Sequence, residues 1–208
     1  MKKIIVAACL VCLISLPMLG SGLKIHFGPA ITNLNYSEAS SLPSIVKQKS
    51  LFQFTGGVGF ELSFAPNFAL ELDLMYAPGG TKFEATSGGV TASETFKGYA
   101  ISLPMLFKVS FLTGTTPYVI AGGFLAYTTS QKIIIDVPGF HDEEDISDDV
   151  NRFQGGLIFG GGVEFSLASM KFLVEGRYSL GLLNLFKDPP PGESVKISNI
   201  FILVGYKF

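Results

Sequence analysis

The stretch of residues 153–183 constrains this chain most, because its side chains alternate between two chemically different faces. Successive side chains of a β-strand point to opposite faces, so this alternation predicts two strands joined by a tight turn at residues 168–170. The apolar face carries Phe153, Leu157, Phe159, Val163, Phe165 and Leu167, then Phe172, Val174, Tyr178, Leu180 and Leu182. The polar face carries Gln154, Gly156, Gly160, Gly162, Glu164 and Ser166, then Lys171, Glu175, Arg177 and Ser179.

The polar face is unusual because it consists of glycines and isolated charges. A sheet exposed to water has no need of such small side chains, whereas the narrow interior of a small closed barrel does. The apolar face would then meet lipid. The hairpin alone leaves a soluble secreted barrel open, and the rest of the chain favours a membrane barrel.

Similar alternation recurs along the chain and predicts six further strands, at residues 23–36, 51–65, 68–77, 95–111, 117–132 and 196–208. The inward or outward phase of residues 117–132 stays open, because both faces are apolar. The connections alternate between long and short, with short turns at residues 65–67, 112–116 and 168–170. Barrels of the bacterial outer membrane have this arrangement, with short periplasmic turns and long external loops. The sequence therefore predicts an all-β fold, an eight-stranded antiparallel up-and-down transmembrane β-barrel.

The N-terminal residues 1–22 have the features of a signal peptide, which leaves residues 23–208 as the mature barrel domain. Lys2 and Lys3 precede an apolar run at residues 4–16, and small residues follow at positions 20–22. An uncleaved anchor helix is the alternative. The two cysteines, Cys9 and Cys12, lie inside this segment, so the mature chain is expected to lack disulfides. Acidic residues outnumber basic ones, which does not favour nucleic acid as a partner.

Five segments resemble the outer-membrane β-barrel family typified by the PorT-like proteins of Bacteroidetes-type Gram-negative bacteria. They lie at residues 99–108, 116–123, 159–165, 175–182 and 205–208. The resemblance implies an eight-stranded barrel in the outer membrane, with no catalytic motif and no cofactor. Its members range from structural barrels to secretion accessories. Tyr206 and Phe208 also resemble the C-terminal aromatic signal that the outer-membrane assembly machinery reads.

Eight charged residues fall on the polar faces of the expected strands. They are five acids and three bases: Glu61, Glu71, Asp73, Glu164, Glu175, Lys108, Arg177 and Lys207. Buried charges must be paired or neutralised, so we expect a salt-bridge network that fills the lumen. The alternative is an ion or proton path, although eight strands leave little room for a channel.

A long connection at residues 133–152 carries an acidic cluster, formed by Asp142, Glu143, Glu144, Asp145, Asp148 and Asp149. Divalent cations prefer such oxygen ligands, so these side chains are candidates for cation contacts, although the spacing is not that of an EF-hand. We predict no defined metal site. Repulsion between like charges predicts a disordered acidic tip, or one ordered only by divalent cations that could bridge to lipid phosphates.

The sequence does not predict an enzyme. The chain has two histidines, His26 and His141, and it lacks the G-x-S-x-G and H-E-x-x-H motifs. We expect a non-enzymatic integral outer-membrane protein that is structural or binds a ligand or protein partner through its external loops. A narrow transport pore or secretion accessory is one alternative. A lipid-modifying enzyme that uses His26 is another. The expected partners are outer-membrane lipid and the assembly machinery, and the external partner is left open.

Overall fold

The computed structural model describes residues 21–36, 46–88, 90–111, 115–168, 170–189, 192 and 194–208. The predicted signal peptide lies outside these residues except for Ser21 and Gly22, so its cleavage stays a prediction. Those two residues begin the first strand and pair with Leu62 and Glu61, which places the start of the barrel two residues before the expected boundary.

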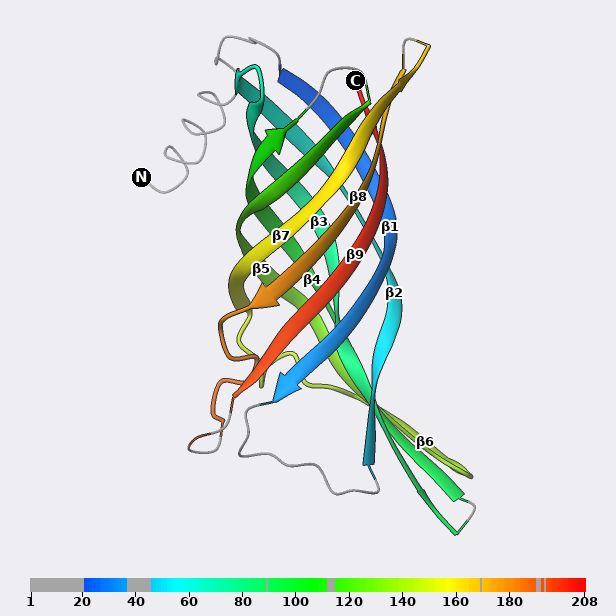
Figure 1. Ribbon diagram of the computed structural model, residues 1–208. Helices are drawn as coiled ribbons and strands as arrows, with labels where there is room; N and C mark the ends of the chain where they lie inside the picture. The colour runs from blue at the N-terminus through cyan, green and yellow to red at the C-terminus, as the bar shows by residue number, and fades with distance from the viewer. Residues whose placement is uncertain are drawn as a thin grey trace.

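The described residues form nine strands. They are β1 (Ser21–Tyr36), β2 (Val46–Ala65), β3 (Phe68–Ser87), β4 (Val90–Ser110), β5 (Thr116–Val137), β6 (Phe140–Asp145), β7 (Phe153–Leu167), β8 (Met170–Gly181) and β9 (Val195–Lys207). All except β6 close into a ring of antiparallel neighbours, in which β1 pairs with β9 and β4 pairs with β5 (Figure 1). The predicted eight-stranded up-and-down barrel is therefore confirmed. No helix in the described part of the chain has the length and apolar character needed to span a membrane.

The largest departure from the expected strands is a sheet that projects beyond the barrel. Residues 78–94 were expected to form a loop, but β3 continues to Ser87 and β4 starts at Val90. The segment contains Thr81, Thr86 and Thr91, which favour strands, and alternation of polar and apolar residues resumes at Lys82 in the opposite phase. We call the projecting sheet the ribbon, formed by residues 46–50, 81–87, 90–97, 132–137 and 140–145 of β2 to β6. It leaves the barrel at the end opposite Phe208 (Figure 1).

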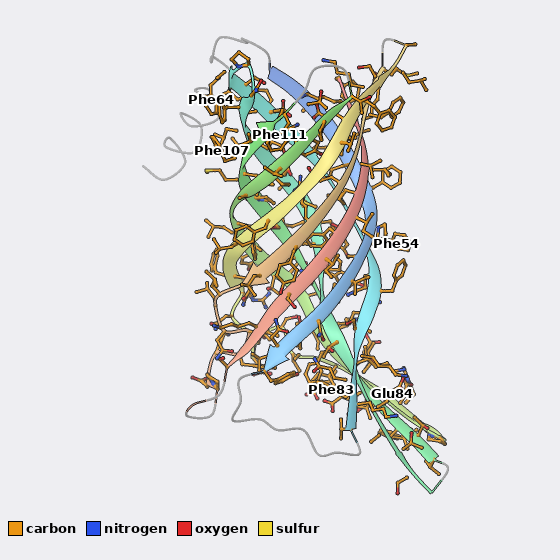
Figure 2. The ribbon with its side chains drawn as sticks, in the orientation of Figure 1. Phe54, Phe64, Phe83, Glu84, Phe107 and Phe111 are labelled. Atoms are coloured by element: carbon orange, nitrogen blue, oxygen red, sulfur yellow. The ribbon has the colours of Figure 1, made fainter. Side chains whose placement is uncertain are left out.

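The outer wall of the barrel is apolar, and aromatic residues border it at both ends, near the short turns and near the ribbon. Near the short turns, the rings of Phe64, Phe68 and Phe107 lie 5.8–6.4 Å apart. At the other level, the rings of Tyr76 and Tyr99 lie 5.2 Å apart. Figure 2 shows Phe64, Phe107 and Phe111 pointing away from the barrel. Eight residues of β3 separate Phe68 from Tyr76, which corresponds to about 20 Å of height in a tilted strand. That spacing suits the apolar band of an outer-membrane barrel.

A bulge shifts the alternation near the ribbon end of β5, a strand whose phase was unclear from the sequence because both of its faces are apolar. The lumen buries the even-numbered residues Tyr118, Ile120 and Thr128 of β5. Gln131 is buried there as well, although its number is odd. The register of β5 against β4 shifts at Thr129, which is skipped between the pairs Tyr99–Ser130 and Ala100–Thr128. One extra residue exchanges the two faces of a strand, so both alternation phases are present along β5.

Candidate functional site: a closed lumen and a projecting ribbon

A layer of charged side chains crosses the lumen towards the end with the short turns. Lys108 lies at its centre, with Nζ 2.7 Å from Glu61 Oε2 and 3.3 Å from Glu71 Oε1. The same ammonium group also contacts the carboxylate of Glu164 on β7. Lys207 Nζ lies 2.6 Å from the other oxygen of Glu61. These contacts link β2, β3, β4, β7 and β9 across the interior.

Arg177 organises the second half of this layer. Its Nη1 donates to Asp73 Oδ2 at 2.6 Å, and its Nε donates to Glu175. The hydroxyl of Tyr118 donates to the other oxygen of Glu175 at 2.8 Å. Lys24 Nζ lies 2.5 Å from Glu71 Oε2 and 3.6 Å from Asp73 Oδ1, which joins this half to the Lys108 half.

The charged layer closes the lumen at its level. Arg177 on β8 and Asp73 on β3 belong to strands that are not neighbours in the ring, so their ion pair spans the interior. Arg177 is only 1% exposed. All eight sequence-predicted residues lie in this network, together with Lys24. An eight-stranded barrel has room for side chains but for little else.

The glycines of the inner face provide the space for these long side chains. A Cβ at Gly59 would lie 2.1 Å from Asp73 Oδ1 and 2.6 Å from Lys24 Cε. A Cβ at Gly162 would lie 2.7 Å from the hydroxyl of Tyr118. The glycines and the isolated charges seen in the sequence therefore belong together, because the glycines leave the space that the charged side chains fill.

Beyond the charged layer the lumen contains a small cavity that is lined mostly by apolar residues, with a few polar side chains, among them Ser102, Thr128, Gln131, Gln154 and Ser179. Its volume of about 50 Å³ is enough for about four water molecules. It could hold no more than a small solute.

A cluster of apolar side chains covers the lumen at the end that carries the long connections. We call it the apolar plug, and it consists of Leu34, Ile146, Val150, Leu185 and Val195. Backbone hydrogen bonds fasten its two connecting segments together, from Asn151 N to Leu185 O at 2.7 Å and from Leu185 N to Val195 O at 2.7 Å. The lumen is thus blocked twice, by charges and by the plug.

The acidic segment differs from expectation. Residues Phe140–Asp145 form β6, which pairs with Lys132–Val137 of β5, so the predicted disordered tip is wrong. The isoleucines at positions 133–135 of β5 favour a strand, and β6 pairs with it. Basic side chains also offset part of the acidic charge, because Lys132 Nζ lies 2.5 Å from Glu143 Oε1 and His141 contacts Asp136. These partners lower the pKa of Glu143 and raise that of His141.

The carboxylates of the acidic segment are not gathered into one site. Asp142 and Glu144 alternate with Glu143 and Asp145 along β6, so they point to opposite faces. Asp148 and Asp149 lie in the following turn, where Asp148 Oδ1 is 2.8 Å from Arg152 Nη2. Among the residues that the structure describes, no three acidic or histidine side chains are placed to hold a metal ion.

Comparison with known proteins identifies the type of barrel. The family model described as "outer membrane protein beta-barrel domain" matches residues 19–187. The chain belongs to this family. Its members reside in the outer membrane of Gram-negative bacteria, and the apolar wall of this outer-membrane barrel lies in the lipid bilayer.

Solved structures resemble the outer-membrane barrel at low sequence identity. Ail, the attachment invasion locus protein of Yersinia pestis, is 15% identical, with 90% of this chain and 99% of that chain covered and a TM-score of 0.45. Neisserial surface protein A is 15% identical, with 91% and 99% covered and a TM-score of 0.46. OprG of Pseudomonas aeruginosa is 15% identical, with 90% and 96% covered and a TM-score of 0.45. No curated protein matches the sequence.

Three lumen residues of the outer-membrane barrel were not among the predicted site residues. Lys24 and His26 occupy successive inward positions of β1, and Tyr118 occupies one on β5. The alternation of β1 places Lys24 and His26 on its polar face, whereas Tyr118 was hidden because both faces of β5 are apolar. Within the described residues, both ring nitrogens of His26 lack a hydrogen-bond partner.

Proposed function

We propose that this protein is a non-enzymatic outer-membrane barrel that binds an external protein partner through its ribbon, while the barrel serves as the anchor. One observation carries the proposal: the lumen is closed, whereas a five-stranded ribbon extends well past the apolar band (Figure 1). A closed barrel offers its surroundings little except its ends. The ribbon is the largest such feature in the described chain.

One face of the ribbon continues the lumen-facing side of the barrel. Its exposed side chains are largely apolar, and three acids share the face, because Glu94 and Asp142 lie opposite Ile135 and Glu144 lies opposite Ile133. We call it the apolar face. On this face Val46 lies opposite Ala85, Ala85 opposite Ala92, and Val137 opposite Phe140. The side chain of Phe140 is 58% exposed, and Val90 and Ile135 on the same face are exposed as well. Contiguous exposed apolar side chains rimmed by charges are typical of protein-binding surfaces.

The topology belongs to the proposal. The start of β1 and Phe208 lie at the end with the short turns, so an even number of strands leaves both on one side (Figure 1). We assign this side to the periplasm and the ribbon to the exterior, as in other outer-membrane barrels. Tyr206 and Phe208 would then present the aromatic signal to the assembly machinery from the periplasmic side.

Single-cysteine labelling tests this topology. A membrane-impermeant maleimide added to intact cells should label Ser87→Cys in the ribbon and spare Ser166→Cys near a short turn, in a background with Cys9 and Cys12 replaced by serine. Labelling of both after permeabilisation is the control. Labelling of Ser166→Cys alone in intact cells would invert the topology.

Crosslinking in intact cells tests the binding role. A photo-crosslinker placed at Phe140 should capture a defined protein partner, and one placed at Ser166 should not capture it. Val90→Asp combined with Ile135→Asp should abolish the capture without changing the amount of folded barrel. Capture that survives this change would show that the apolar face is not the binding surface.

Two alternatives keep specific tests. A secretion accessory role of the PorT-like kind would be supported if the captured partner belonged to a secretion machine. A lipid-modifying enzyme would need His26, yet this side chain lies in the lumen beside Asp73 and Arg177 and is 2% exposed. We therefore expect His26→Ala to leave the lipid profile of the membrane unchanged.

A further inference from the structure

The face of the ribbon opposite to the apolar face carries four lysines close to the barrel. Lys49 of β2 lies directly opposite Lys82 of β3. Lys97 of β4 lies directly opposite Lys132 of β5. Lys82 pairs with Thr95, two residues from Lys97 on the same face, so the two lysine pairs occupy adjacent rows. We call these four residues the lysine patch.

The charges of the lysine patch are only partly compensated within the chain. Like charges directly opposite each other on neighbouring strands are destabilising. Glu84 serves two lysines, with oxygens 2.5 Å from Lys49 Nζ and 3.1 Å from Lys82 Nζ. Glu143 lies 2.5 Å from Lys132 Nζ. Asp145 of β6 also lies directly opposite Lys132, so three carboxylates face the four lysines. Lys97 makes no ion pair with any residue that the structure describes, which leaves the patch a surplus of one positive charge that suits an anionic ligand.

The lysine patch is continuous with the wall that faces lipid. Lys97 is two residues from Tyr99 on the same outward face of β4, and its Nζ lies 5.6 Å from the centre of the Tyr99 ring. Tyr99 and Tyr76 belong to the aromatic level that borders the apolar band. Lys97 and the row of Lys82 lie about 7 and 13 Å further along the strand, which corresponds to about 5–10 Å in height. This is the depth of the lipid headgroups next to the hydrocarbon core.

We propose that the lysine patch binds the phosphate groups of a phosphorylated glycolipid in the outer leaflet, of the bisphosphorylated glucosamine-disaccharide type. Lysine ammonium groups bind phosphate as compact point charges. The barrel wall below the patch would contact the acyl chains of the same lipid, which a soluble polyanion could not provide. The assignment to the outer leaflet rests on the proposed topology.

The test uses the purified full-length barrel in phosphatidylcholine nanodiscs. Adding the bisphosphorylated glycolipid should raise the thermal unfolding midpoint, whereas its dephosphorylated form should not. The variant with Lys49→Gln, Lys82→Gln, Lys97→Gln and Lys132→Gln should lose the rise. Lys97→Gln alone should weaken the apparent affinity about fivefold, the effect expected for one lysine at a membrane surface. Lys196→Gln, on the outward face at the same end of β9, should change little.

A variant with all four lysines replaced by arginine is the control that separates loss of charge from misfolding, because it keeps the charges and should keep the rise in unfolding midpoint. An unchanged rise in the fourfold glutamine variant would overturn the proposal. So would an equal rise with the dephosphorylated glycolipid, or one with phosphatidylglycerol, since the latter would indicate any anionic lipid. Failure here leaves the topology intact. Inverted cysteine labelling would instead remove the patch from the outer leaflet, so the two failures are distinguishable.

Discussion

At the scale of single residues, we expect the loss of one charge from the charged layer to destabilise the barrel. Arg177→Met would leave Asp73 and Glu175 without their guanidinium partner in the lumen, which should cost about 3–5 kcal/mol of unfolding free energy. Urea unfolding in lipid vesicles measures this cost. Arg152→Gln is the matched control, because its partner Asp148 is almost fully exposed and exposed ion pairs contribute little. Equal stabilities of the two variants would mean that water screens the lumen charges.

At the scale of elements, we expect the stability of the pairing between β5 and β6 to depend on pH. Asp136 on β5 raises the pKa of His141 on β6 above its ordinary 6.5. A raised pKa means that the ion pair stabilises the β5–β6 pairing fully below the ordinary value and loses this effect as pH rises through the raised value. An NMR titration of the His141 ring should show the raised pKa, and Asp136→Asn should return it towards 6.5. Asp148→Asn should leave it unchanged. A wild-type pKa at or below the ordinary value would contradict this pairing.

At the scale of the whole molecule, two barriers in series close the lumen. The charged layer and the apolar plug lie on opposite sides of the small cavity. The protein should therefore give no stable single-channel steps in planar bilayers. Removing the plug with Ile146→Ser and Leu185→Ser should not open a path, because the charged layer remains. Stable steps from the wild-type protein would favour the transport alternative.

The sequence predicts this molecule best where one alternation runs undisturbed. The eight crossings and all eight predicted lumen charges follow from the period of two, since burial imposes the same rule on every inward position. The bulge at Thr129 and the plug at Ile146 and Leu185 could not be predicted, because both depend on contacts between distant segments. The ribbon was underestimated because residues rich in threonine, serine and glycine resemble a loop until their cross-strand partners are known. The acidic residues of β6 were predicted to be disordered for a similar reason, because their partners on β5 are known only from the structure.

The continuity of β4 and β5 has a mechanical consequence. The two strands stay paired from the short-turn end to the ribbon, interrupted only at Thr129. A partner that pulls on the ribbon along its length would load this ladder in shear, so that many hydrogen bonds resist at once and none can be opened singly. The ribbon has edges at β2 and β6, but β4 and β5 lie inside it and the barrel below is closed, so neither strand offers a free edge at which peeling could begin. On the proposed topology, these paired strands would therefore transmit tension from the ribbon directly into the part of the barrel that lies in the membrane.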